Sequence, residues 1–225
     1  MTPAPNAHAA PEAARHMDGL YRYQRHIYDA SRKYYLLGRD RLIAELRPPP
    51  GGRLLEVGCG TARNLILAAR RYREVAAYGF DISPVMLETA RRNIARAGLS
   101  RRIVVTEGDA ARWSAEPLLG VAGFDRILIS YALSMISPWR EALEAAYRGL
   151  VPGGELHVVD FGQQERLPRW FRSGLHAWLA LFSVTPRADL LTELAALARR
   201  HGAGLDHERL YRGYAVRAVV RKPVA

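Results

Sequence analysis

The chain has 225 residues, 49% of them hydrophobic, which suits one globular domain with a substantial core. A formal net charge of +11 predicts attraction to polyanions, either nucleic acid or an anionic membrane surface. The single cysteine excludes an internal disulfide and a cysteine-rich metal site, and no run of 18 apolar residues could span a membrane. Cysteine usage favours a reducing, cytoplasmic compartment.

The N-terminal segment changes character at about residue 17. Residues 1–16 are rich in alanine and proline and lack an apolar core, so we expect a disordered tail rather than a secretory signal. Residues 17–46 are predicted to be helical and end at the breaker RPPPGG. We therefore expect one domain over residues 17–225, whose N-terminal helical segment (17–47) forms a lid.

Strand and helix patterns alternate after the breaker. Strands are predicted at 53–58, 75–81, 102–109, 124–130 and 154–161, and helices at 62–72, 83–98 and 138–149. This alternation indicates an α/β fold with a mostly parallel sheet covered on both faces. Residues 204–221 leave no room for a crossover helix, which predicts an antiparallel hairpin at the end of the chain.

A glycine-rich turn follows the first predicted strand, in the sequence LLEVGCGTARN (54–64). Gly58 and Gly60 allow a tight turn and a close approach of the backbone to a ligand. Such a turn alone is compatible with dinucleotide binding or with a plain connection. Acidic residues strengthen the interpretation as a cofactor-binding turn, because Glu56 lies in the first strand, Asp81 ends the second and Asp109 ends the third.

From Gly52 to Gly162 the sequence resembles the class I S-adenosylmethionine-dependent methyltransferases. The resemblance implies a Rossmann-like, seven-stranded sheet and S-adenosyl-L-methionine as cofactor. It implies these cofactor-binding residues: Glu56, Gly58, Cys59 and Gly60 at the methionine end, Asp81 and Ile82 at the ribose and adenine, Asp109 and Ala110 at the adenine edge, and Ser130 at the end of the fourth strand. Ala62 replaces a third glycine found in many members, and Arg63 departs from the nicotinamide-enzyme pattern, which favours S-adenosylmethionine over NAD.

The substrate side of such a fold lies near the end of the fourth strand. Adenine and amide N-methyltransferases resemble one another in an N/D-P-P-Y quartet there, whereas this chain has Ser130, Tyr131, Ala132 and Leu133. A nucleic-acid partner is therefore not favoured, and an RNA methyltransferase with other motifs remains an alternative.

Tyrosine and arginine alternate on one face of the predicted N-terminal helix. The residues of this Tyr/Arg face are Tyr21, Arg25, Tyr28, Arg32, Tyr35 and Arg39. We assign substrate binding to Tyr21 and the arginines, and a catalytic role to Tyr28 and Tyr35 with Tyr131, since guanidinium groups bind carboxylate or phosphate and ring faces bind a methylated ammonium. A solvated arginine face with partly packed tyrosines is the alternative.

The segment MDGLYRYQRHIYDASRKYYLLGRDRLI (17–43) resembles the N-terminal helices of bacterial betaine-lipid N-methyltransferases, and the likeness extends to LPRWFRSGLHAWLALFSVTPRADL (167–190). It implies trimethylation of the amine of diacylglyceryl-homoserine, and a partner enzyme that supplies this lipid. Phospholipid N-methyltransferases acting on phosphatidylethanolamine are the nearest alternative, and a small-molecule methyltransferase is a further one.

Residues 167–182 fit a lipid substrate on their own pattern. Leu167, Trp170, Phe171, Leu175, Trp178 and Phe182 share one side of a helical wheel, opposite Arg166, Arg169, Arg172 and His176. We expect peripheral contact with an anionic membrane, with an ordinary core-facing helix as the alternative.

No metal is expected. The possible proton acceptors His26, Asp29, Asp40 and Tyr131 are not distinguished by their spacing.

Overall fold

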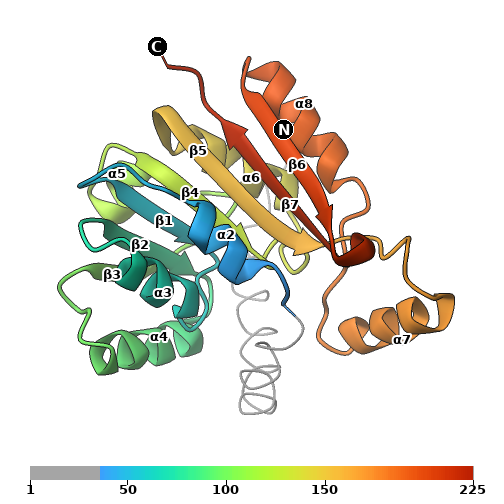
Figure 1. Ribbon diagram of the computed structural model, residues 1–225. Helices are drawn as coiled ribbons and strands as arrows, with labels where there is room; N and C mark the ends of the chain where they lie inside the picture. Colours follow the sequence, from blue (N-terminus) through green and yellow to red (C-terminus); the bar gives the residue numbers. More distant parts are fainter. Residues whose placement is uncertain (1–35, 225) are drawn as a thin grey trace, which may run out of the picture.

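Seven strands form one sheet in the computed structural model, which describes residues 36–224 (Figure 1). The strands are β1 (Arg53–Val57), β2 (Ala76–Asp81), β3 (Ile103–Glu107), β4 (Phe124–Ser130), β5 (Leu150–Phe161), β6 (Gly204–Leu210) and β7 (Ala215–Arg221). Their order in space is β3-β2-β1-β4-β5-β7-β6. β1 to β5 are parallel, and β7 is antiparallel to both β5 and β6. The predicted fold class, including the C-terminal hairpin, is confirmed.

Helices cover both faces of this sheet. They are α2 (Arg39–Glu45), α3 (Arg63–Arg71), α4 (Pro84–Arg96), α5 (Ala115–Leu119), α6 (Trp139–Arg148), α7 (Arg169–Ala180) and α8 (Leu190–Arg200), with a short 3-10 helix, η1 (Tyr211–Gly213). α2, α3 and α4 pack on one face, and α5, α6 and α8 pack on the other. α5 and α8 were not predicted from the sequence, and β5 begins four residues before its predicted start.

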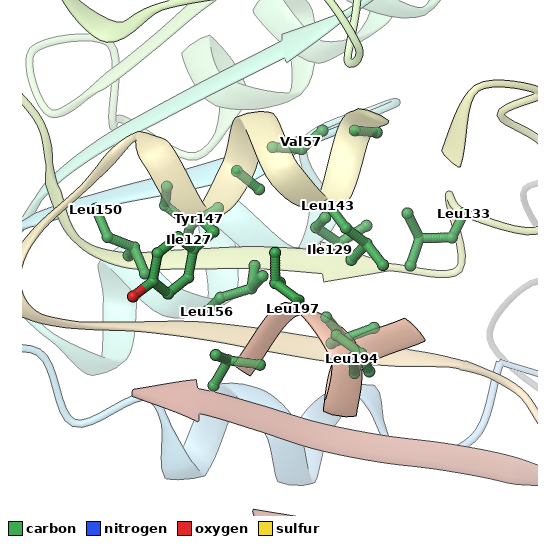
Figure 2. Close-up of a cluster of buried hydrophobic side chains, with 14 of the residues drawn as sticks. Val57, Ile127, Ile129, Leu133, Leu143, Tyr147, Leu150, Leu156, Leu194 and Leu197 are labelled. Atoms are coloured by element: carbon green, nitrogen blue, oxygen red, sulfur yellow. The ribbon is translucent and has the colours of Figure 1, made fainter. Parts of the chain in front are cut away.

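The largest apolar cluster lies between the sheet and the layer of α6 and α8. Leu143 of α6, Leu194 of α8 and the β4 residues Ile127 and Ile129 all belong to this cluster, and Figure 2 shows Leu143 beside Ile129. Leu128, between these two isoleucines, belongs to the cluster on the opposite face. Because the parallel strand is buried on both faces, its sequence is continuously apolar rather than alternating.

The predicted helix over residues 17–46 does not run unbroken through its described part. Gly38 has a left-handed φ of 86°, and α2 begins only at Arg39. A Cβ on Gly38 would approach Leu210 Cδ1 to 2.9 Å, so the close contact with the sheet also requires glycine. Arg39 therefore does not continue a regular helical face from the residues before it. The predicted tail (1–16) and most of the predicted lid lie outside the described residues.

The predicted helix over residues 167–182 is present as α7, but its apolar side is divided. Leu175 and Trp178 are partly buried against the core, beside Leu179, which is 1% exposed and was not part of the predicted face. Trp170 and Phe171 are instead 77% and 36% exposed. The apolar side is therefore not in one environment along its length, because only the second half of α7 packs on the body.

A buried carboxylate at the end of β5 holds the loop that follows β4. Asp160 is 1% exposed, and it accepts hydrogen bonds from the backbone N–H groups of Ser134 (3.2 Å) and Phe161 (2.7 Å). Burial raises the pKa of Asp160 to about 6, against the opposing effect of the nearby Arg187. Arg187 also donates to the Leu133 carbonyl at 3.0 Å, so two side chains fix the same loop from different sides.

Replacing Asp160 by asparagine should remove one source of pH dependence from the free energy of unfolding. The pKa of Asp160 in the folded protein lies above its unfolded value of about 3.9. The contribution of Asp160 to the stability of the wild type is therefore complete below about pH 4 and is lost as the pH rises through about 6. Over that interval the wild type should lose up to about 3 kcal/mol relative to Asp160→Asn. Urea unfolding at a series of pH values measures the difference, and parallel curves for the two proteins would contradict it.

Candidate functional site

The turn after β1 brings the backbone around in left-handed conformations. Gly58 and Gly60 have φ values of 68° and 50°, and Ala62 has 63°. A Cβ on Gly58 would lie 2.8 Å from the Ala132 Cβ, so this turn passes directly against the loop after β4. Between the glycines, the Cys59 N–H donates to the Phe80 carbonyl at 3.0 Å. The two glycines are required by geometry, and Ala62 adopts the conformation that glycine would take at lower cost.

Glu56 lies beneath this turn and is 2% exposed. Its Oε1 accepts a hydrogen bond from Asn64 Nδ2 at 2.7 Å. Asn64 lies in the first turn of α3, so the helix reaches back to orient the acid of the neighbouring strand. Asn64 was not among the site residues predicted from the sequence. An amide side chain one helical turn beyond Gly60 could have indicated a partner for Glu56.

Asp81 joins the turn from the adjacent strand. Its Oδ2 accepts from the Gly60 N–H at 2.8 Å, and its Oδ1 accepts from the Ser83 N–H at 3.0 Å. Carboxylate oxygens are acceptors, as the two hydroxyls of a ribose require. Ile82 follows Asp81 and is partly exposed, and Ser83 caps α4 by accepting from the Met86 N–H at 3.3 Å.

Asp109 lies after β3, at the same edge of the sheet. Its Oδ1 accepts from the Ala111 N–H at 2.9 Å, which closes a short turn. Ala110 is partly buried against the main apolar cluster. Beside Asp109 lies a pocket of about 430 Å³, whose lining includes Arg112 and Trp113. The pocket adjoins the position that the resemblance assigns to the adenine edge.

The residues at the end of β4 and just after it are more buried than the sequence suggested. Ser130 is 7% exposed, and Tyr131 is 2% exposed with a left-handed φ of 55°. The Tyr131 hydroxyl donates to the Leu37 carbonyl at 2.6 Å, and its ring packs edge-on against Phe161 at 4.7 Å. Burial raises the pKa of Tyr131 well above its ordinary value, so the phenol stays protonated. Its geometry supports anchoring of the turn before α2 rather than proton acceptance.

Two other polar residues also have partners inside the protein. Asp40 is largely exposed and forms an ion pair with Arg63 at 3.1 Å. Arg39 is 7% exposed, and its Nε donates to the Leu36 carbonyl at 3.1 Å. These contacts place Arg39 in the packing of α2 and not on a surface. The other predicted lid residues, Tyr21, Arg25, Tyr28, Arg32 and Tyr35, lie outside the described residues, as do His26 and Asp29.

Cys59 does not provide a reactive thiol. It is 5% exposed, and burial raises its pKa well above the ordinary value, reinforced by the charges of Asp81 and Glu56. Its part in a cofactor site is therefore that of a small residue whose backbone shapes the turn.

The three acidic residues and the turn fit S-adenosylmethionine by their chemistry. Glu56, Asp81 and Asp109 stand on or just after three neighbouring parallel strands, near the edge where ligands of open α/β sheets bind. Carboxylates suit the cationic amine and sulfonium groups, the ribose diol and the adenine amine, and the glycines leave room for the donor.

Within residues 36–224, no group of three or more His, Cys, Asp or Glu side chains is placed to hold a metal ion. No helix in the same part of the chain has the length and apolarity needed to cross a bilayer.

Comparisons with known proteins agree with this geometry. Residues 54–154 match a family model described as a methyltransferase domain. A tRNA1(Val) (adenine(37)-N6)-methyltransferase of Porphyromonas gingivalis is 33% identical over 101 residues, which are 44% of this chain and 40% of that protein. A ubiquinone/menaquinone biosynthesis C-methyltransferase of Cereibacter sphaeroides is 32% identical over 127 residues, which are 56% of this chain and 49% of that protein.

Among solved structures, the S-adenosylmethionine-dependent methyltransferase SibL in its apo form is similar with a TM-score of 0.63 and 24% identity. The match covers 88% of this chain and 58% of that one. The matches span less than half the length of the two curated relatives. Residues 54–154 match the methyltransferase-domain model, the chain has the class I, Rossmann-like methyltransferase fold, and S-adenosylmethionine is the methyl donor that this fold implies.

Proposed function

We propose that the chain is a lipid N-methyltransferase that trimethylates the amine of diacylglyceryl-homoserine, giving the betaine lipid diacylglyceryl-trimethylhomoserine, and that it works at the cytoplasmic membrane surface. One observation carries the lipid assignment beyond the resemblance. Phe182, just after α7, packs against Met86 in the first turn of α4, and Met135, which follows β4, packs against the same methionine. The apolar segment 167–182 therefore borders the same edge of the sheet as the acidic residues.

An amine acceptor needs mainly its lone pair and correct placement. The reference pKa of an α-amine is about 8, so a neutral fraction exists near neutral pH without a strong base. When bound, S-adenosylmethionine supplies an electrophilic methyl group. Glu56, Asp81 and the turn at Gly58 would hold this donor, while the Asp160-bound loop fixes the substrate side. The contribution of the chain is positioning, which alone can lower a barrier by several kcal/mol.

Other acceptors compete with diacylglyceryl-homoserine. Phosphatidylethanolamine offers a primary amine on a diacyl lipid and is the nearest alternative. The similarity to a ubiquinone/menaquinone biosynthesis C-methyltransferase favours a quinone precursor as the second candidate. An adenine base, suggested by the tRNA methyltransferase relative, is disfavoured by the sequence Ser130-Tyr131-Ala132-Leu133, which lacks the expected quartet.

Replacing Asp81 by alanine should weaken S-adenosylmethionine binding by about 2–4 kcal/mol, because a ribose diol would lose two hydrogen bonds to a charged acceptor. Isothermal titration calorimetry measures the change. Asp125→Ala is the matched control, since Asp125 also accepts a backbone hydrogen bond (from Arg53, 2.7 Å) but lies at the opposite edge of the sheet. Equal affinity in the two variants would leave Asp81 with a structural role only.

Cells that contain the chain together with an enzyme making diacylglyceryl-homoserine should accumulate mono-, di- and trimethylated forms of that lipid. Mass spectrometry of total lipids identifies them, and Asp81→Ala serves as the inactive control. Methylated phosphatidylethanolamine without any betaine lipid would move the assignment to the phospholipid enzymes. Methylation of a quinone precursor alone would remove the lipid-amine proposal.

Tyr28→Ala or Tyr35→Ala should stall the reaction at mono- or dimethylated lipid. Each ring face contributes about 0.5–2 kcal/mol to a nearby cation, and the product is a permanent cation. Arg32→Ala should raise the lipid concentration required, because a guanidinium can hold the homoserine carboxylate. Arg39→Ala is the contrasting variant, expected to lower the melting temperature because Arg39 is buried in α2. Complete trimethylation in both tyrosine variants would reduce the Tyr/Arg face to packing.

A further inference from the structure

We propose that the beginning of α7 and the residues before it form a docking surface for anionic lipid bilayers. This docking surface consists of Arg166, Arg169, Trp170, Phe171 and Arg172. It deepens the proposed function and rests on it, since it specifies how a lipid-modifying enzyme would reach its substrate, but its existence can be tested without any methyl transfer.

Large apolar side chains are exposed on this surface in an unusual concentration. Six large apolar residues of the described chain are exposed, and three of them lie within residues 170–181. Trp170 is 77% and Phe171 36% exposed, and their rings form a T-shaped pair with centroids 5.9 Å apart. Isolated exposed apolar residues need no explanation, but a tryptophan-phenylalanine pair in contact marks an interaction site.

The helix that presents this pair is fastened to the protein at its other end. Leu179 is buried, and Trp178 and Phe182 pack against each other with ring centroids 5.0 Å apart. His176 Nε2 lies 2.7 Å from Oε1 of Gln164, which is fully buried. Because its second half is anchored, α7 holds the exposed pair at a defined place beyond the end of β5 (Figure 1).

The charge around the pair favours an anionic bilayer over other apolar partners. Arg166, Arg169 and Arg172 lie at the surface, and residues 166–180 contain no acidic residue. The nearest acid along the chain, Glu165, is paired with Arg209 at 2.8 Å. A second copy of the chain would bring these arginines against one another across a two-fold axis, whereas lipid phosphates neutralise them. Tryptophan in particular suits the boundary between headgroups and acyl chains.

The position of the docking surface agrees with delivery of a lipid headgroup. The second half of the same segment reaches Met86 through Phe182, and Met135 packs against the same methionine, next to the strand ends that carry the acidic residues. A bilayer bound at Trp170 would therefore lie beside the open edge of the sheet.

Co-sedimentation of the purified 225-residue chain with vesicles tests the docking surface. We expect binding to phosphatidylcholine vesicles that contain phosphatidylglycerol, much weaker binding to phosphatidylcholine alone, and loss of binding as salt is added. Arg169→Gln with Arg172→Gln should weaken binding about thirtyfold at low salt, from about 1 kcal/mol per basic residue. Trp170→Ser with Phe171→Ser should weaken it at least about tenfold at every salt concentration.

Matched controls come from the opposite end of the sheet. Val104→Ser changes an apolar residue that is 51% exposed on β3, and Arg91→Gln with Arg96→Gln removes two exposed arginines from α4. Both controls should bind vesicles like the wild type. If they weaken binding as strongly as the α7 variants, binding depends on total charge and the proposal is wrong.

Quenching by brominated lipid gives a second readout that does not depend on affinity. Four tryptophans are present, and only Trp170 should be strongly quenched by bromine on the acyl chains near the headgroup. Trp170→Phe should retain binding and lose this quenching. Unchanged quenching in Trp170→Phe would overturn the proposal. So would a wild-type dimer that becomes a monomer in the double variant Trp170→Ser with Phe171→Ser while vesicle binding stays the same.

These results are separable from the proposed function. Vesicle binding through α7 without any methylated lipid amine would support the docking surface and contradict the function. Methylation of detergent-solubilised lipid, combined with vesicle binding that ignores the α7 variants, would contradict the docking surface and leave the function standing.

Discussion

The contact between Asp81 and the turn after β1 is the constraint on which the site depends. The turn must reverse within a few residues, so Gly58 and Gly60 adopt left-handed conformations and leave backbone N–H groups without helical partners. Asp81, from the neighbouring strand, accepts one of them from Gly60 and another from Ser83 at the start of α4. One carboxylate thus fixes the strand ends, the glycine turn and a helix N-terminus together, and any donor bound there meets an organised edge.

The amino-acid sequence predicted this edge well because its signals are local. Alternating strand and helix patterns indicate a parallel sheet, and parallel strands bring their carboxyl ends to one edge. Glu56, Asp81 and Asp109 could therefore be assigned to one edge from their positions in the chain alone. The hairpin at the end of the chain was also predictable, since residues 204–221 are too few to include a crossover helix.

Features that depend on tertiary contacts could not be read in the same way. Asn64 orients Glu56 only because α3 turns back over β1, and Asp160 is recognisable as a loop anchor only once β5 lies beside the residues after β4. The helical wheel of residues 167–182 indicated one apolar side, yet burial changes along α7 because the body of the protein supports only its second half. Tyr131 was predicted to be catalytic because a phenol can take part in proton transfer, but its hydroxyl donates a hydrogen bond to the carbonyl of Leu37.

The net positive charge is a weaker guide to partners than its size suggests, because many arginines serve the fold. Arg102 donates to three backbone carbonyls at the end of α3 and before β2, and Arg126 donates to two carbonyls before β1. Arg187 does the same for the loop after β4. Arginine suits this work, since its planar group offers five donors that can satisfy several carbonyls at once. Location is therefore more informative than number, and the exposed arginines beside Trp170 are notable because that segment carries no acid to balance them.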